Sequence, residues 1–382
     1  MKKIICILVI AVLMAGSAAY ADQHLEMICC FSGATEKTNV SYDLYEQEEQ
    51  IIAVSTLFPD YAAVIPKGEG CSLSSVNSFL SLTPEMMIDL QNTADSMIIT
   101  YLESRLSVPE NGVYAGELFT DANTRRTAEF PLSDLTGFLQ EDTYNHVSGG
   151  SASLLSILAG VIGDSLKQRE IILSVQSFNQ EQFLSCSITE QNQVIMTVSI
   201  DRSQRNERRI LIGYREDGLY CYRDVDIKNE QNHIDVRSAF RTGSASSYQR
   251  AGEEEPLFTE ETILTGEKDE PIAFQYMLSS GVLSSPMYIS GTFAGQENQA
   301  SLNATVRING PEKEESISVS LILEPLSRPV SVSDKKTIDM TDEKENAIIP
   351  LTAASNAALL AAEILPAFPE NYQKLIMKLI YP

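Results

Sequence analysis

The sequence has no tryptophan and only three histidines, His24, His146 and His233. The histidines lie far apart along the chain, and none belongs to an HxH, HExxH or HxxxH pattern. Zinc sites built on histidine usually take two ligands from such a short spacing. The sequence therefore predicts no histidine-based zinc centre, and His24 and His233 are interpreted as surface residues.

Other motifs that carry chemistry are also missing. The chain contains no GxSxG nucleophile motif, no P-loop, no GxGxxG and no CxxC. Asp224-Val225-Asp226 resembles the start of a calcium loop, but Lys228 occupies the third ligand position and the required glycine is absent. We therefore predict no catalytic residue, no cofactor and no metal, and a protein that is not an enzyme.

Positive charge is scarce: Lys and Arg number 28 against 52 Asp and Glu, for a net charge of −24 at pH 7. An acidic surface repels phosphate backbones and anionic lipid headgroups, so no nucleic-acid partner is expected. Long apolar runs are also missing after residue 21, because Ala152–Ile162 is too short and Ala357–Phe368 is interrupted by Glu363. No transmembrane segment is predicted in the mature chain.

The first 21 residues have the pattern of a cleaved leader. Two lysines precede an apolar run from Ile4 to Ala15, and Ala19 and Ala21 supply the small residues that a signal peptidase requires. The sequence therefore predicts a signal peptide over residues 1–21 and a secreted or periplasmic location. Cys29 follows an isoleucine rather than a small residue, so a lipid anchor is not expected.

Alternation of apolar and polar residues dominates the chain after residue 170. From Gln299 to Ile308, apolar side chains occupy every second position, which is the period of a strand with one buried face. The same pattern predicts strands near 171–177, 182–189, 193–201, 208–215, 218–227, 233–241, 272–279, 287–295, 299–308 and 315–324. Because short polar turns join most of them, an antiparallel meander is predicted.

The N-terminal part has a mixed pattern. Thr83 is an expected N-cap, Pro84 suits the first helical position, and apolar residues at helical spacing extend the helix to residue 106. The other elements expected in this part are strands near 25–32, 38–45, 50–57 and 61–65, a hairpin of 112–120 with 126–132, and helices near 132–142 and 151–168.

Two stretches have little pattern. Residues 242–271 are rich in Ser, Gly and Glu and are interpreted as an acidic loop, and residues 331–346 are interpreted as a charged linker. Short helices near 353–365 and 370–380 are expected to follow. The predicted divisions are a signal peptide (1–21), an N-terminal α+β unit (22–145), a helix plus meander (146–330) and a linker with C-terminal helices (331–382).

These elements predict an α+β fold, in which a large curved antiparallel β-meander is covered by amphipathic helices at 84–106, 151–168 and 353–380. A one-sided apolar sheet of this size must bury its apolar face. The arrangement resembles the curved sheet of bacterial lipid and lipoprotein carriers of the LolA and LppX group. That resemblance implies an apolar cavity between sheet and helices that holds an acyl chain.

Five cysteines remain after the predicted leader, so they cannot all pair with one another. Cys29 and Cys30 are neighbours on an expected strand and therefore point to opposite faces. One is expected to face the core, and the other to be a free thiol or bonded to Cys71. A bond between Cys186 and Cys221 requires the meander to curl until their strands meet.

The predicted function is a non-enzymatic secreted or periplasmic binding protein that holds an amphipathic, lipid-like ligand between sheet and helices. The alternative is a structural or protein-interaction module of the cell envelope. A hydrolase with a site scattered over several strands ranks below both. The expected partner is thus an amphipathic small molecule or an envelope protein.

Overall fold

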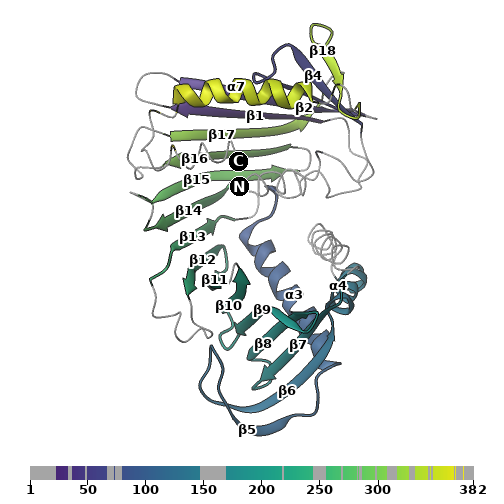
Figure 1. The fold of residues 1–382 in the computed structure, drawn as a ribbon, viewed down its shortest axis with the longest axis vertical. Coiled ribbons are helices and arrows are strands. Elements are labelled where there is room, and N and C mark those ends of the chain that lie inside the picture. Colours follow the sequence, from purple (N-terminus) through teal and green to yellow (C-terminus); the bar gives the residue numbers. More distant parts are fainter. Residues whose placement is uncertain are drawn as a thin grey trace. The chain divides into compact units, whose positions relative to one another are not determined.

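The structure is a computed structural model with eighteen strands and three helices in its described residues (Figure 1). These residues are 23–32, 37–47, 50–66, 73, 80–146, 169–216, 219–243, 255–267, 270–281, 283, 286–296, 299–307, 316–326, 332–342, 345, 347–364, 366 and 373. The predicted leader with Ala19 and Ala21, the 151–168 helix and Cys71 lie outside them. Of the expected 370–380 helix, residue 373 is described.

The chain forms two compact units. Unit 1 consists of residues 1–83, 266–277 and 282–382, and unit 2 consists of residues 84–265 and 278–281. Unit 1 therefore combines the two ends of the chain, and unit 2 is the middle. This differs from the consecutive divisions expected from the sequence.

The sheet of unit 1 joins the N-terminal and C-terminal parts of the chain. Its strands are β1 (Gln23–Ser32), β2 (Lys37–Glu46), β3 (Gln50–Ser55), β4 (Tyr61–Pro66), β15 (Met287–Gln296), β16 (Gln299–Arg307), β17 (Ser316–Pro325) and β18 (Lys336–Asp339). Pairing is antiparallel in the order β15-β16-β17-β1-β2-β3-β4, and β18 pairs parallel with β4. Strand β14 (Ile272–Ser280) has residues in both units.

Alternating side chains build two cores in unit 1. Leu25 lies opposite Leu323 on β17, and both pack with Leu73, Leu80 and Ala300. The second core packs helix α7 (Ile348–Ile364) against β4 and β18 through Phe58, Ala63, Ile338 and Ile349. Both cores therefore unite residues from the two ends of the chain.

Unit 2 is an antiparallel meander with two helices. Its elements are α3 (Pro84–Glu103), β5 (Glu110–Tyr114), β6 (Ala122–Pro131), α4 (Leu132–His146), β7 (Ile171–Phe178), β8 (Phe183–Glu190), β9 (Gln193–Asp201), β10 (Glu207–Glu216), β11 (Leu219–Glu230), β12 (His233–Gly243) and β13 (Phe258–Thr265). Each strand from β5 to β12 pairs with the next one in sequence. The core lies where Tyr101 and Leu102 of α3 pack on Phe130, Leu173 and Val175.

The predicted α+β fold class is wrong. Strands dominate the described residues, and the helices do not share one sheet face: α3 and α4 pack in the core of unit 2, whereas α7 packs in unit 1. The physical reason is that α3 and α4 bury their apolar sides in one cluster of residues, and α7 buries its apolar side in another. The resemblance to the LolA and LppX carriers is therefore also wrong, since it requires helices that close together over one sheet.

Two strands lie where the sequence predicted irregular structure. Strand β13 occupies part of the expected acidic loop, and its charges are matched across the ladder, where Arg237 Nε lies 2.9 Å from Glu261 Oε1 and Arg223 pairs with Glu260. Strand β18 occupies part of the expected linker, and its one buried apolar side chain is Ile338. Both were missed because cross-strand partners, rather than local alternation, stabilise them.

Candidate functional site

A polar cleft of about 360 Å³ lies in unit 2 between α3 and two hairpin turns. We call it the α3 cleft. It is lined by Glu85, Ile88, Asp89 and Asn92 of α3, Arg205 and Asn206 between β9 and β10, and Asn229, Glu230 and Gln231 at the β11–β12 turn.

The residues that α3 contributes to the cleft follow from their spacing along the helix. Glu85, Ile88, Asp89 and Asn92 recur at three- and four-residue intervals, which places them on one face of an α-helix. Residues on the other side of α3, such as Tyr101 and Leu102, are buried in the core. Core packing therefore turns the polar face of α3 toward the two hairpin turns.

Asp95 anchors α3 to the strands below the cleft. Its Oδ2 lies 3.3 Å from Arg208 Nε and 3.5 Å from Arg202 Nη2. The two arginine side chains are only 11% and 18% exposed, so the contact is screened less than a surface pair. Arg208 Nη1 also donates to the backbone oxygens of Gln204 and Arg205, at 2.8 and 3.2 Å. The Arg208 side chain thus contacts both α3 and the turn that carries Arg205.

Asn229 forms the floor of the cleft and is 9% exposed. Its Nδ2 donates to Gln91 Oε1 of α3 at 2.9 Å, and its backbone nitrogen donates to the oxygen of Asn206 at 2.8 Å. Its Oδ1 is buried and has no hydrogen-bond partner among the described residues. Such an acceptor costs about 1–3 kcal/mol unless a donor reaches it.

The polar groups of the α3 cleft are of three kinds. Its nine described lining residues include three carboxylates, four side-chain amides and one guanidinium. Carboxylates and amides offer hydrogen bonds and ion pairs to a small polar molecule. In the described part of the chain, no group of three or more His, Cys, Asp or Glu side chains is arranged to hold a metal.

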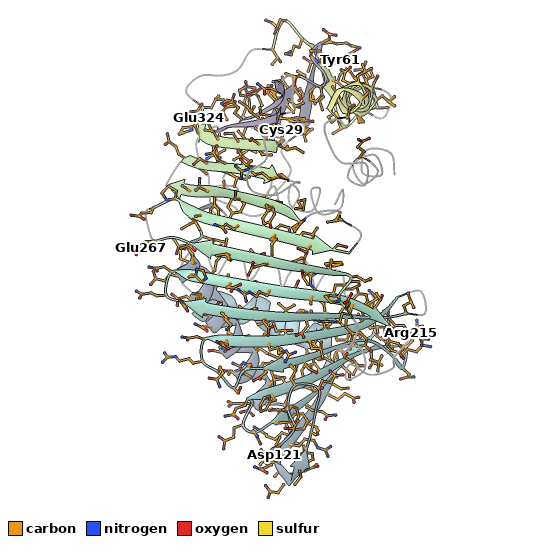
Figure 2. The ribbon with its side chains drawn as sticks, turned by 90° about the vertical axis from the view of Figure 1, so that its left-hand side faces the viewer. Cys29, Tyr61, Asp121, Arg215, Glu267 and Glu324 are labelled. Atoms are coloured by element: carbon orange, nitrogen blue, oxygen red, sulfur yellow. The ribbon has the colours of Figure 1, made fainter. Side chains whose placement is uncertain are left out.

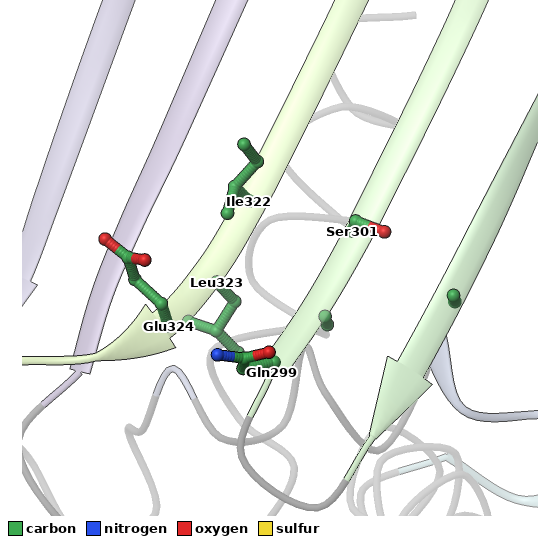
Figure 3. A pocket seen from close by; sticks show the side chains of 7 residues that line it. Gln299, Ser301, Ile322, Leu323 and Glu324 are labelled. Carbon is green, nitrogen blue, oxygen red and sulfur yellow. The ribbon is translucent and has the colours of Figure 1, made fainter.

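A second pocket, of about 270 Å³, lies on the sheet of unit 1 (Figure 3). It is lined by Ala294, Gln299, Ala300, Ser301, Ile322, Leu323 and Glu324. The Glu324 side chain extends away from Gln299 and Ser301 (Figure 3), and its Oε1 contacts His24 Nδ1 at 3.3 Å. The polar groups of this second pocket therefore do not converge on one point.

His24, expected to be a surface residue, connects three strands of unit 1. Its Nε2 lies 3.0 Å from Asp43 Oδ1 on β2, and its Nδ1 contacts Glu324 on β17. The ring stacks on Tyr45 with centroids 4.6 Å apart. Burial, followed by the charges of Asp43 and Glu26, raises the pKa of Tyr45. Asp43 and Glu324 therefore contact opposite nitrogens of the His24 ring. These contacts join β1 to β2 and to β17.

The cysteines do not form one site. Cys29 lies on β1 (Figure 2) as a free thiol, and burial raises its pKa. Cys30 is the next residue of the same strand. Cys186 is a free thiol on β8, whereas Cys221 lies on β11 with β9 and β10 between them. Three strand spacings separate them by about 14 Å, too far for a disulfide. A Cys30–Cys71 bond stays a prediction because Cys71 is not described.

Cys186 is expected to resist alkylation in the folded protein. Burial raises its pKa to about 11, so at pH 8 only about one thiol in a thousand is the reactive thiolate. Iodoacetamide labelling followed by peptide mass spectrometry should show at least a hundredfold slower modification of Cys186 in the native chain than in urea. Equal rates in the two states would contradict its burial in the unit 2 core.

The residues of the α3 cleft have no shared signature in the sequence. The polar positions of α3 were visible as a helical face, but nothing local connects Glu85 with Arg205 or Asn229. Asp224 and Asp226, considered for calcium, instead lie beside Arg209, whose Nη2 is 2.8 Å from Asp224 Oδ2 and whose Nε is 3.9 Å from Asp226 Oδ1. Burial and then Asp224 raise the pKa of Asp226.

No protein family and no curated protein matches this chain. Similar solved structures include a BenF-like porin from Pseudomonas fluorescens Pf-5, with 8% identity, a TM-score of 0.26, and coverage of 82% of this chain and 100% of that one. OccK3 of Pseudomonas aeruginosa has 9% identity, a TM-score of 0.24, and coverage of 79% and 94%.

No helix in the described ranges has both the length and the hydropathy needed to cross a bilayer.

Proposed function

We propose that this chain is a non-enzymatic binding protein of the bacterial envelope that holds a small polar molecule in the α3 cleft. The observation that carries the proposal is the unpaired, buried Oδ1 of Asn229 in the floor of a cleft lined by charged and amide side chains. A bound molecule with a hydrogen-bond donor would satisfy this acceptor. The N-terminal leader pattern supports the envelope location.

The polar lining changes the expected ligand. An acyl chain in the α3 cleft would remove water from carboxylates and amides without replacing their hydrogen bonds, which is unfavourable. The lipid-like ligand expected from the sequence is therefore replaced by a hydrophilic one.

A second candidate function is a protein-interaction module that uses α7. Leu351 and Leu359 are 70% and 65% exposed on this helix, and positions eight residues apart lie near the same face. Exposed leucines on one helix face are typical of contact surfaces. This candidate predicts that binding of a partner protein depends on Leu351 and Leu359 and not on Asn229.

Thermal unfolding with a panel of polar metabolites tests the first proposal. A molecule bound at 100 times its Kd should stabilise the folded chain by about 2.7 kcal/mol. Asn229→Ala should weaken that binding about tenfold, while Asn303→Ala, an exposed amide on β16, should leave it unchanged. Stabilisation by fatty acids alone, or equal binding by the Asn229→Ala chain, would refute the proposal.

A further inference from the structure

The charged side chains that line the α3 cleft are mostly carboxylates. Glu85, Asp89 and Glu230 contribute carboxylates to its lining, against one guanidinium from Arg205. Ionised carboxylates only accept hydrogen bonds. The charged groups that line the cleft therefore carry net negative charge and favour a ligand rich in N–H donors.

The three carboxylates come from two sides of the cleft. Glu85 and Asp89 are four residues apart on one helix face, and Glu230 is on the facing β11–β12 turn. Glu85 also lies in the first turn of α3, where its charge offsets the positive end of the helix dipole. A positively charged group placed between helix and turn would thus contact carboxylates on both sides.

Asn229 supplies an independent observation. Its amide nitrogen is already used by Gln91, so the group left unpaired in the floor is the carbonyl oxygen, an acceptor. An anionic ligand such as a carboxylate has no donor for this atom, whereas an ammonium group has three. Charge in the lining and the unpaired acceptor in the floor favour the same ligand chemistry.

We propose that the ligand of the α3 cleft is a small organic cation carrying primary ammonium groups. This inference rests on the proposed function, because it names the ligand class of the same site. Arg205 is then a specificity residue: its guanidinium repels the cation and limits affinity for simple amines.

Isothermal titration of the full chain with three four-carbon molecules provides the test. The probes are 1,4-diaminobutane, 1,4-butanediol and succinate, which share a chain length and differ in charge. We expect the diamine to bind and the other two not to bind at the same concentration. Binding should weaken with added salt, because the contacts are between partly exposed charges.

Two exposed residues of the cleft provide opposite changes in charge. Asp89→Asn should weaken diamine binding about fivefold, and Arg205→Gln should tighten it about fivefold. Succinate binding without diamine binding would overturn the inference, as would equal binding of diamine and diol or no effect of Asp89→Asn. If a polar molecule binds in an Asn229-dependent way but no amine does, the cation inference fails and the proposed function stands. If no polar molecule shows Asn229-dependent binding, both fail.

Discussion

Replacing Asp95 with alanine should lower the free energy of unfolding of unit 2 by about 2–3 kcal/mol. The substitution leaves Arg202 and Arg208 without the carboxylate that they share, at 3.5 and 3.3 Å. Removing one partner from a partly buried ion pair is costly because the remaining charges stay desolvated. Urea unfolding followed by circular dichroism would measure the loss, since the chain has no tryptophan to report by fluorescence.

The same substitution should also remove ligand binding at the α3 cleft. Asp95 connects the helix that carries Asp89 to the turn that carries Arg205. Without that connection, the two sides of the cleft lose their fixed separation. Diamine binding should therefore fall by at least tenfold, even where the chain remains folded.

Asp134→Ala is the matched control in unit 2. Asp134 pairs with Arg105 at 3.8 Å, and both side chains are more than 40% exposed, at 41% and 48%. An exposed ion pair contributes about 0.5 kcal/mol to the free energy of unfolding. Equal losses for Asp95→Ala and Asp134→Ala would show that burial of the Asp95 contacts does not matter.

Leu323→Ala should lower the free energy of unfolding of unit 1 by about 3–4 kcal/mol. Leu323 is 0% exposed and packs with Leu25, Leu73, Leu80 and Ala300. Truncation leaves a cavity beside Leu25, Leu73 and Leu80, and the surrounding close-packed side chains relax into it only in part. Chemical unfolding monitored by circular dichroism provides the measurement.

The neighbouring residue provides the control for Leu323. Ile322 is 42% exposed and points to the other face of β17. Ile322→Ala should therefore cost less than about 1 kcal/mol. A larger loss for Ile322→Ala than for Leu323→Ala would mean that the two faces of β17 had been assigned the wrong way round.

Most of the local elements follow from residue patterns alone, with β13 and β18 as the exceptions. Alternation located β16 and β17 within two residues of their observed ends, and Thr83 with Pro84 located the start of α3. These features are local because a strand face or a helix cap depends on residues only a few positions apart. The order of strands within the unit 2 meander follows from short turns, and it too was predictable.

Which distant segments meet depends on contacts that residue patterns do not reveal. The pairing of β1 with β17 across almost the whole chain, and of β18 with β4, depends on shared burial and has no local signature. The predicted α+β fold class was wrong because the residue pattern of a helix does not show which strands that helix covers. The α3 cleft has the same origin: Asp89, Arg205 and Asn229 come together because core packing orients α3 and Asp95 fixes it to the strands. Long-range burial and ion pairing, rather than residue spacing, therefore create the site.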